Sequence, residues 1–464
     1  MNLSTSQLSR LSGFGQADYG DAYVFRPTNV GEIKEVFALA KANHKQVALR
    51  GSGRSYGDAA FGSEDIVLDI TRMNRILSWD KESGIVECEA GATIEDLWRY
   101  CMEDGYWPPV VTGTMYPSLA GALAMNVHGK NNFCKGTLGE HVTELEVVLS
   151  TGEVRILTPS DDLFYSVISS AGLLGVISRV KLKMHKVVSG SLKVWAGAAQ
   201  NWDDQFAMFE RFEKDADYMV SWVDCFGRMN NRGRGQFHAA WYSDYPNPQS
   251  LRADAQDLPA LILGFFPKSI VWRALKFFCN RAGMWFINWA KFTASRILGH
   301  EKFHEESLVG YSFLLDYVPD WRKAYAPGGF IQYQSFVPKE SAKEVFDKQV
   351  LLQQEYGLES YLGVLKRHRP DRFMFSHAVD GYSLALDFKV TARNRKRLWD
   401  MAHRMNELVL AAGGRFYFAK DSTLRPSDAA AYLGSSLETF RMLKKQLDPD
   451  NLLTSDLAKR LELT

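Results

Sequence analysis

The amino-acid sequence predicts an α+β protein with two lobes. The chain has 464 residues, which is more than most single domains contain. Helix-like and strand-like stretches alternate as far as about residue 185, whereas strand-like stretches prevail from about residue 190. This change of pattern predicts a mixed first lobe and a second lobe built on an antiparallel sheet.

Each element of the first lobe has a local signal. Residues 30–43 carry apolar side chains at helical spacing, and Thr93 is a suitable N-cap for a second helix over 93–103. Short apolar runs predict strands at residues 45–49, 65–70, 85–89, 142–149, 153–157 and 176–184. Residues 150–152, Ser-Thr-Gly, form the turn between two of these strands.

The second lobe contains further strands and one long helix. Strands are predicted over 218–225, 237–241 and 381–388. Gln332 and Gln334 alternate on another strand, so both side chains point to one face. A helix over 395–411 ends before Gly413-Gly414, and a strand over 415–420 follows.

Composition excludes several functional classes. The formal net charge of +1 predicts no general nucleic-acid-binding surface. The five cysteines are dispersed without the spacing of a metal site, so we expect no metal and the reduced thiols of a cytoplasmic protein. Residues 1–16 are polar, and no apolar run approaches the roughly 18 residues that span a bilayer. We therefore expect neither a signal peptide nor a transmembrane helix.

The most informative segment is the loop over residues 50–58, Arg-Gly-Ser-Gly-Arg-Ser-Tyr-Gly-Asp, which follows the strand predicted at 45–49. Glycine permits positive φ and lets a bound group approach the backbone. Consecutive N–H groups in such a turn form an anion-binding nest, here flanked by two arginines. The loop therefore predicts a pyrophosphate cradle, although its spacing matches neither G-x-G-x-x-G nor a Walker loop. A plain surface turn is the alternative.

Further glycine-rich segments follow, at residues 108–114, 120–132, 136–142 and 172–177. With loop 50–58 in place, the chain resembles the FAD-binding flavoproteins of the vanillyl-alcohol oxidase (p-cresol methylhydroxylase) class. Within that class it is similar to the decaprenylphosphoryl-β-D-ribose 2′-oxidase family. The segments that carry the likeness are spread over nearly the whole chain, at 50–58, 127–131, 330–334, 419–422 and 455–461.

The resemblance implies a division of the chain. Residues 1–187 and 406–464 would form the FAD-binding domain, and 188–405 the substrate-binding domain with an insertion at 258–299. The FAD contacts implied are Arg50, Gly51, Ser52, Gly53, Arg54, Ser55, Tyr56, Gly57, Gly113, Thr114, Ser118, Gly121, Ala124, His128, Gly129, Asn131, Ile177 and Tyr417. Loop 50–58 contains no His or Cys that would attach a flavin, so we expect non-covalent FAD.

The resemblance also implies catalytic and substrate-binding residues. Lys420, His128 and Tyr56 are expected beside the flavin, where a lysine can stabilise the reduced ring. The base that takes the hydroxyl proton is left open between Lys420, His128 and a bound water. The substrate contacts implied are Lys130, Gln332, Gln334, Lys366, Ser383 and Tyr417. Their cationic and amide groups suit a phosphate-bearing sugar.

The implied function is FAD-dependent oxidation of a secondary alcohol on a polyprenyl-phosphate-linked sugar. The 2′-hydroxyl of decaprenylphosphoryl-β-D-ribose, or of a similar lipid-linked pentose, would become a ketone. An NAD(P)H-dependent short-chain reductase partner would then complete an epimerisation to arabinose for the arabinan of a cell wall. Ala385 departs from the family, whose best-known members carry a cysteine there that thiol-reactive inhibitors trap. The alternatives are an alditol or aldonolactone oxidase of the same FAD class, and a non-catalytic protein that binds lipid phosphate at a membrane surface.

Residues 258–299, here called the basic aromatic segment, lack any acidic residue. The basic residues are Lys268, Arg273, Lys276, Arg281, Lys291 and Arg296, and among them lie Phe265, Phe266, Trp272, Phe277, Phe278, Trp285, Phe286, Trp289 and Phe292. Several apolar residues recur at helical spacing from Val271 to Phe292, with Arg273, Lys276 and Lys291 on another face. A cationic helix with an aromatic face suits an anionic headgroup region, so we expect peripheral contact with the plasma membrane. The alternative is a helix hairpin packed as a lid on the second lobe.

Overall fold

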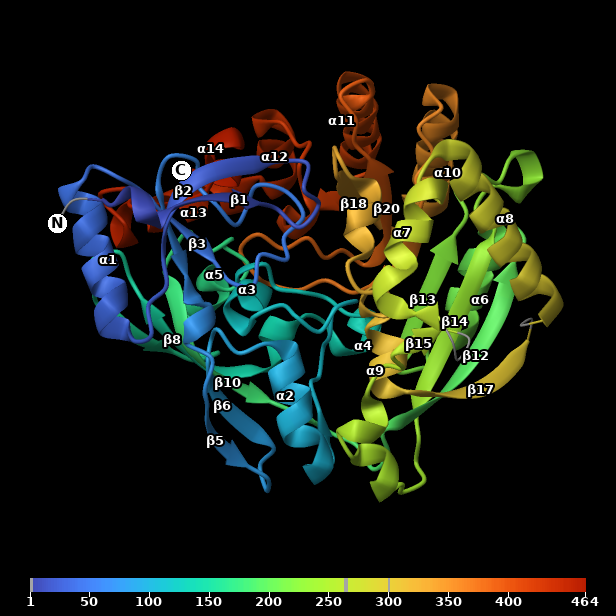
Figure 1. Cartoon of the computed structure of the whole chain (residues 1–464), viewed down its shortest axis with the longest axis horizontal. Coiled ribbons are helices and arrows are strands. Elements are labelled where there is room, and N and C mark those ends of the chain that lie inside the picture. The colour runs from blue at the N-terminus through green and yellow to red at the C-terminus, as the bar shows by residue number, and fades with distance from the viewer. Residues whose placement is uncertain (1–2, 263–265, 299–300) are drawn as a thin grey trace.

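The fold comes from a computed structural model that describes residues 3–262, 266–298 and 301–464. Helices and sheets form an α+β structure of two lobes, which confirms the predicted class. In Figure 1 the first lobe lies on the left, in blue, teal and red, and the second lobe lies on the right, mostly in green, yellow and orange. Elements from the two ends of the chain thus lie together in the first lobe.

The first sheet contains strands from both ends of the chain. Its strands lie in the order β1, β2, β4, β3 and β22 (Leu8–Ser12, Tyr19–Phe25, Ile66–Asp69, Val47–Arg50 and Leu453–Thr454). β1 is antiparallel to β2, and the other neighbours are parallel. Helix α1 (Val30–Ala42) begins at Asn29, whose side chain accepts a hydrogen bond from Glu32 N–H. Its apolar face packs on this sheet through Ile33 and Phe37.

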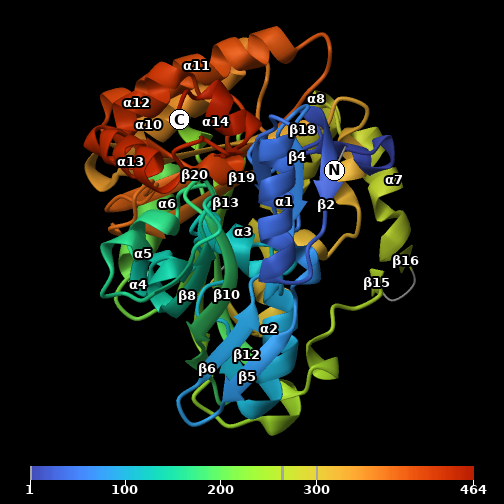
Figure 2. The same ribbon diagram turned by 90° about the vertical axis from the view of Figure 1, so that its left-hand side faces the viewer.

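The second sheet of the first lobe is antiparallel. Its strands lie in the order β5, β6, β10, β8 and β9 (Ile76–Asp80, Ile85–Glu89, Val176–Lys183, Val142–Val148 and Val154–Leu157). Helix α2 (Ile94–Cys101) begins at Thr93, the predicted N-cap, which also forms a capping box with Asp96. Shorter helices surround the sheet, namely α3 (Leu119–Ala124), α4 (Asn132–Lys135) and α5 (Asp162–Val167). Figure 2 shows this sheet below the first one.

The second lobe is built on an eight-stranded sheet in which every pairing is antiparallel. The order is β17, β12, β14, β13, β19, β20, β18 and β21 (Lys302–Ser307, Ser191–Ala199, Gly235–Tyr242, Tyr218–Val223, Gly363–His368, Gly381–Lys389, Phe330–Pro338 and Arg415–Phe416). Helices α6 (Trp202–Phe212), α10 (Lys339–Tyr356) and α11 (Arg395–Ala411) cover one face. The opposite face is left for the site described below.

The remaining elements are short or lie at the periphery. Two-stranded ladders join β7 (Tyr106–Trp107) to β11 (His185–Lys186), and β15 (Leu261–Ile262) to β16 (Phe266–Pro267). Besides the two helices of the basic aromatic segment, the described chain contains α9 (Leu308–Ser312), α12 (Pro426–Leu433), α13 (Ser435–Leu447) and α14 (Asp456–Arg460). In the described part of the chain, none of the helices has the length and apolar character required to cross a bilayer.

Two predicted elements differ from the structure. The strand expected over 415–420 ends at Phe416, and residues 418–420 form a 3₁₀ turn. The cause is a contact from far along the chain, because Tyr56 N–H donates to Ala419 O at 2.8 Å. The basic aromatic segment forms two helices, α7 (Lys268–Phe278) and α8 (Arg281–Leu298), which break its apolar stripe at buried Cys279. Phe265 and Gly299 lie outside the described residues.

Candidate functional site

A cavity of about 490 Å³ is lined by residues of both lobes. On the second lobe its wall is the face of the eight-stranded sheet that α6, α10 and α11 do not cover. Side chains alternate along a strand, so every second residue of β13, β14, β18, β19 and β20 points to this face. The sheet residues that line the cavity include Trp222, Gln236, His238, Gln332, Gln334, Val364, Lys366 and Ala385.

Most of the predicted site residues meet at this cavity. Those that line it are Arg50, Gly51, Ser52, Gly53, Arg54, Ser55, Tyr56, Gly113, Thr114, Ser118, Gly121, Ala124, His128, Lys130, Ile177, Gln332, Gln334, Lys366, Tyr417 and Lys420. Four predicted residues lie behind its wall instead, namely Gly57, Gly129, Asn131 and Ser383. A Cβ at Gly57 would lie 2.0 Å from Asp421 O, so this glycine permits close packing on the C-terminal segment. Asn131 holds its own loop by donating to Pro109 O at 2.8 Å.

Loop 50–58 has the features of an anion cradle. Gly53 has a φ of +64°, which favours glycine, and a Cβ at Gly51 would lie 2.0 Å from Ser118 Oγ. Ser52 Oγ and Arg54 Nε are buried and have no hydrogen-bond partner among the described residues. A pyrophosphate that approached the backbone would supply those partners. The residues present therefore fit the pyrophosphate of a dinucleotide such as FAD.

Lys420 lines the cavity next to the cradle loop, and the buried carboxyl of Asp387 lies near it. The Nζ atom of Lys420 lies 3.7 Å from the centroid of the Tyr56 ring. Burial lowers the pKa of the Lys420 ammonium, although nearby Asp387 opposes the shift. Burial likewise raises the pKa of the Asp387 carboxyl, whose Oδ1 accepts a hydrogen bond from Gln332 Nε2 at 2.5 Å. A proton can thus be exchanged at Lys420 Nζ at moderate pH.

Two further lysines make the cavity cationic. Burial lowers the pKa of Lys366 to about 8. Lys130 donates to Tyr311 O, and its Nζ lies 4.1 Å from the centroid of the Tyr311 ring. With Lys420, these lysines suit a ligand that carries negative charge.

Sequence reasoning missed several residues of this region. Asp316 accepts hydrogen bonds from Thr114 Oγ1 and Met115 N–H, each at 2.7 Å, and so holds the loop that contains Gly113. No local signal indicates this contact across the chain. Asp387 was detectable in principle, because it follows Ser383 and Ala385 at alternate positions of a predicted strand. Lys291 of α8 also lines the cavity. The sequence pattern instead predicts that Lys291 lies on the charged face of a membrane-bound helix.

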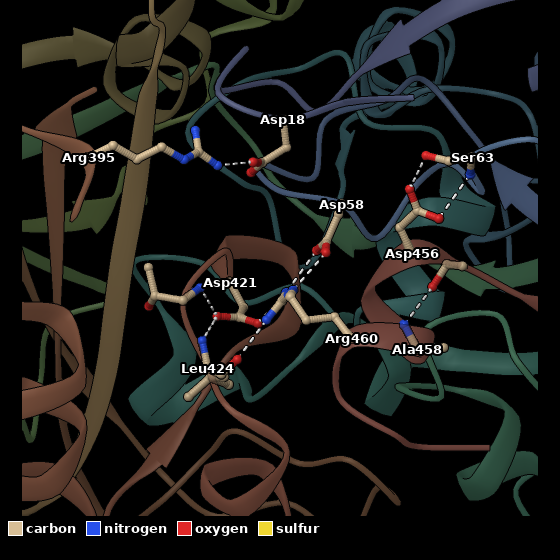
Figure 3. A network of polar contacts seen from close by, with 11 residues as sticks. Asp18, Asp58, Ser63, Arg395, Asp421, Leu424, Asp456, Ala458 and Arg460 are labelled. Carbon is tan, nitrogen blue, oxygen red and sulfur yellow. Dashed lines mark hydrogen bonds and ion pairs between the residues drawn. The ribbon is translucent and has the colours of Figure 1, made fainter. Parts of the chain in front are cut away.

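Figure 3 shows how the C-terminal helix α14 ties two cavity loops together. The guanidinium of Arg460 donates to both carboxylate oxygens of Asp58, at 2.7 and 2.8 Å, and to Asp421 Oδ2 at 2.8 Å. Asp421 also accepts hydrogen bonds from the N–H groups of Thr423 and Leu424. One arginine thus joins the end of the cradle loop to the residue next to Lys420.

We expect Arg460→Met to destabilise the protein by about 3–5 kcal/mol, because it leaves two buried carboxylates without the cation that pairs with them. Urea unfolding followed by circular dichroism measures the loss. Arg395→Met is the matched control, since the Arg395–Asp18 pair in the same view is more exposed, at 46% and 23% against 28% and 4% for Arg460–Asp421. That control should cost about 0–1 kcal/mol. Equal losses of unfolding free energy in the two variants would contradict the stabilising role of Arg460 between the two loops.

Comparisons with known proteins identify the ligand class. A family model described as an FAD binding domain matches residues 22–158, which include loop 50–58. The chain is 29% identical to decaprenylphosphoryl-β-D-ribose oxidase of Mycolicibacterium smegmatis, over 98% of this chain and 97% of that protein. It is 29% identical to a putative D-arabinono-1,4-lactone oxidase of Neurospora crassa over 50% of this chain and 40% of that protein. It is 30% identical to L-gulonolactone oxidase of Mus musculus over 34% of this chain and 36% of that protein. FAD is therefore the cofactor, and the chain is an FAD-dependent oxidoreductase that is similar along nearly its whole length to a decaprenylphosphoryl-β-D-ribose oxidase.

Proposed function

We propose that the enzyme oxidises the 2′-hydroxyl of decaprenylphosphoryl-β-D-ribose, or of a similar polyprenyl-phosphate-linked pentose, to the 2′-ketone. The observation that carries this proposal is the extent of the similarity. The relative named for a lipid-linked ribose matches both lobes, whereas the two lactone oxidases match half of this chain or less. The ketone would pass to an NAD(P)H-dependent short-chain reductase that returns the epimeric alcohol.

The cavity suits such a substrate chemically. Lys130, Lys366 and Lys291 supply positive charge for a phosphate, and the Gln332 and Gln334 amides lie among them for sugar hydroxyls. Arg50 to Ser55, with Ser118 and Gly121, would hold the FAD. The bound FAD supplies the acceptor for a hydride from the carbinol carbon.

Lys420 is the group we assign to the hydroxyl proton. Its lowered pKa leaves a fraction of neutral amine that can accept a proton at Nζ. Once protonated, the same atom places a positive charge beside the Tyr56 ring, where it can stabilise developing negative charge. Asp387 and Gln332 keep this corner of the cavity polar.

Anaerobic bleaching of the flavin absorbance tests the proposal. The panel contains a polyprenylphosphoryl-β-D-ribose, its 2′-deoxy analogue as the matched control, an aldonolactone and an alditol. We expect bleaching by the ribosyl lipid and none by the 2′-deoxy analogue. Faster bleaching by the lactone or the alditol would favour the lactone or alditol oxidase instead.

The FAD should be released by acid or heat. The cradle loop offers Ser55 and Tyr56 at its centre and no His or Cys that would form a bond to the flavin ring. The measurement is flavin absorbance in the supernatant after acid precipitation of the yellow protein. Flavin that remains with the pellet would overturn non-covalent binding.

We also propose that α7 and α8 contact an anionic membrane surface. Their outer faces expose Phe277 (82%), Ile297 (67%), Trp285 (50%) and Phe286 (49%). The structure reduces the number of available cations from six to three. Arg281 pairs with Glu359 at 2.6 Å, Lys268 is buried against Tyr317, and Lys291 lines the cavity. Arg273, Lys276 and Arg296 are the exposed cations of the described segment that neither pair with a carboxylate nor line the cavity.

Binding to anionic vesicles should weaken when these three cations are neutralised to glutamine or when salt is raised, since each contributes on the order of 1 kcal/mol near such a surface. Co-sedimentation with anionic and neutral vesicles at two salt concentrations measures it. The matched control neutralises three exposed lysines elsewhere, Lys34, Lys214 and Lys396. Equal pelleting of both variants, or none of the wild type, would favour a lid on the second lobe.

A further inference from the structure

A chain of hydrogen bonds runs through five buried side chains at the back of the cavity. Asn132 Oδ1 lies 3.0 Å from His368 Nδ1, and His368 Nε2 lies 2.7 Å from Ser383 Oγ. Ser383 Oγ lies 3.1 Å from Gln334 Nε2, which in turn lies 3.2 Å from His128 Nε2. Gln334 and His128 line the cavity, whereas the other three residues do not.

The backbone fixes the direction of the first bond. Arg369 N–H donates to Asn132 Oδ1 at 3.2 Å, so the amide atom that faces His368 is oxygen. The reversed amide would place an NH₂ group against this backbone N–H. His368 must therefore carry a proton on Nδ1. Burial holds the pKa of His368 well below its ordinary value, so the ring is neutral and Nε2 is an acceptor.

The remaining roles follow one after another. The Ser383 hydroxyl gives its single proton to His368 Nε2, so its oxygen accepts from the Gln334 amide NH₂. The second hydrogen of that NH₂ group points to His128 Nε2, which must accept it. His128 is thus the neutral tautomer with its proton on Nδ1. Gln334 Oε1 accepts no hydrogen bond from the described residues, and it is the amide atom left for a ligand.

We infer that His368 is a positioning residue, which through Ser383 orients the Gln334 amide so that its oxygen faces the cavity and its nitrogen holds His128. The group that meets Gln334 must then be a hydrogen-bond donor. Under the proposed function, on which this part rests, that group is a sugar hydroxyl rather than a phosphate oxygen. Because the lone pair of His128 Nε2 is occupied, His128 is also excluded as the proton acceptor at that atom, which leaves Lys420 and a bound water for that role.

His368→Phe is a suitable probe because it keeps a ring and removes both hydrogen bonds. The ring of His368 packs 4.8 Å from the rings of His128 and Phe336. Without an acceptor at position 368, the Ser383 hydroxyl is free to donate to Gln334 instead. The amide can then reverse, and His128 can adopt the other tautomer.

Histidine-selective ¹⁵N NMR of the FAD-loaded enzyme reads the tautomer without any substrate. We expect the Nδ1–H form of His128 in the wild type and a mixture of forms in His368→Phe. His377→Phe is the matched control, because His377 packs 5.2 Å from His128 and 4.8 Å from Phe336 but has no hydrogen-bond partner among the described residues. That control should leave His128 unchanged. An Nε2–H form in the wild type, or the same change in both variants, would overturn the inference.

Flavin reduction by the ribosyl lipid gives a second readout. His368→Phe should raise the substrate concentration for half-maximal reduction about fivefold to tenfold, the effect of one neutral hydrogen bond, with the limiting rate nearly unchanged. Ser383→Ala is the milder variant and should reproduce this shift, and the double variant should lose no more than either single one. If His368 had a purely structural role, His368→Phe would instead lower the FAD content. If the effects of the two single variants added up in the double variant, the proposed hydrogen-bond chain would be wrong. If no sugar reduces the flavin while the tautomers behave as expected, the proposed function fails and the hydrogen-bond chain stands.

Discussion

Replacing Lys420 with methionine should slow reduction of the bound flavin by substrate at least about 100-fold, with little change in FAD affinity. The substitution keeps an unbranched side chain over the Tyr56 ring and removes the only group that we assign to the hydroxyl proton. A positioned acid–base group commonly contributes about 100-fold or more to a chemical step. Stopped-flow flavin reduction measures the rate, and flavin fluorescence measures the affinity for FAD.

Lys366→Met is the matched comparison, because Lys366 is also a cavity lysine whose pKa burial lowers. We expect it to raise the substrate concentration for half-maximal reduction and to leave the limiting rate within a few-fold. The wild-type limiting rate should rise with pH through the lowered pKa of Lys420, since only the neutral amine accepts a proton. Lys420→Met should abolish that rise. A limiting rate within a few-fold of wild type in Lys420→Met would make Lys420 structural.

The parts of the fold with local signals could be predicted from the sequence. The N-cap at Thr93, the helix over 395–411 and the strand over 85–89 each depend on neighbouring residues, and the structure confirms them. The 3₁₀ turn before Asp421 depends on a backbone hydrogen bond from Tyr56, more than 300 residues away, so local propensity could not reveal it. The break between α7 and α8 likewise reflects the burial of Cys279 against other parts of the chain.

The site residues also fall into those that the sequence could predict and those that only the structure shows. Gly51 and Gly53 of loop 50–58 and the predicted lysines Lys130, Lys366 and Lys420 have a recognisable chemistry, and they line the cavity. The resemblance assigned Ser383 to the substrate, but the structure places it behind the wall, between His368 and Gln334. His368 itself follows Lys366 by two residues on a strand, which puts both on one face. Its partner Asn132 comes from the other lobe, and only the assembled structure could show that contact.

Gly53→Val should abolish FAD binding and leave the two lobes folded. Gly53 has a φ of +64°, where a β-branched residue is strained, and a Cβ there would lie 2.2 Å from Arg50 Nη2. Arg50 cannot easily give way, because its guanidinium already donates to Ala60 O at 3.1 Å and to Ser12 O at 3.3 Å. The valine would therefore displace the cradle backbone or fill the space that the pyrophosphate needs.

Gly413→Val is the matched control, because it introduces the same backbone strain at a place outside the cradle loop. Gly413 has a φ of +69°, so a valine meets the same backbone strain, but a Cβ there would meet no atom within 4 Å. In thermal unfolding, the left-handed conformation should cost both variants on the order of 1–2 kcal/mol, and Gly53→Val should lose more because its Cβ also meets Arg50. Only Gly53→Val should lose the flavin, measured as the ratio of flavin to protein absorbance after purification and after addition of excess FAD. Full FAD occupancy in Gly53→Val would place the pyrophosphate site elsewhere, and loss of FAD in Gly413→Val would attribute the effect to general destabilisation rather than to the cradle.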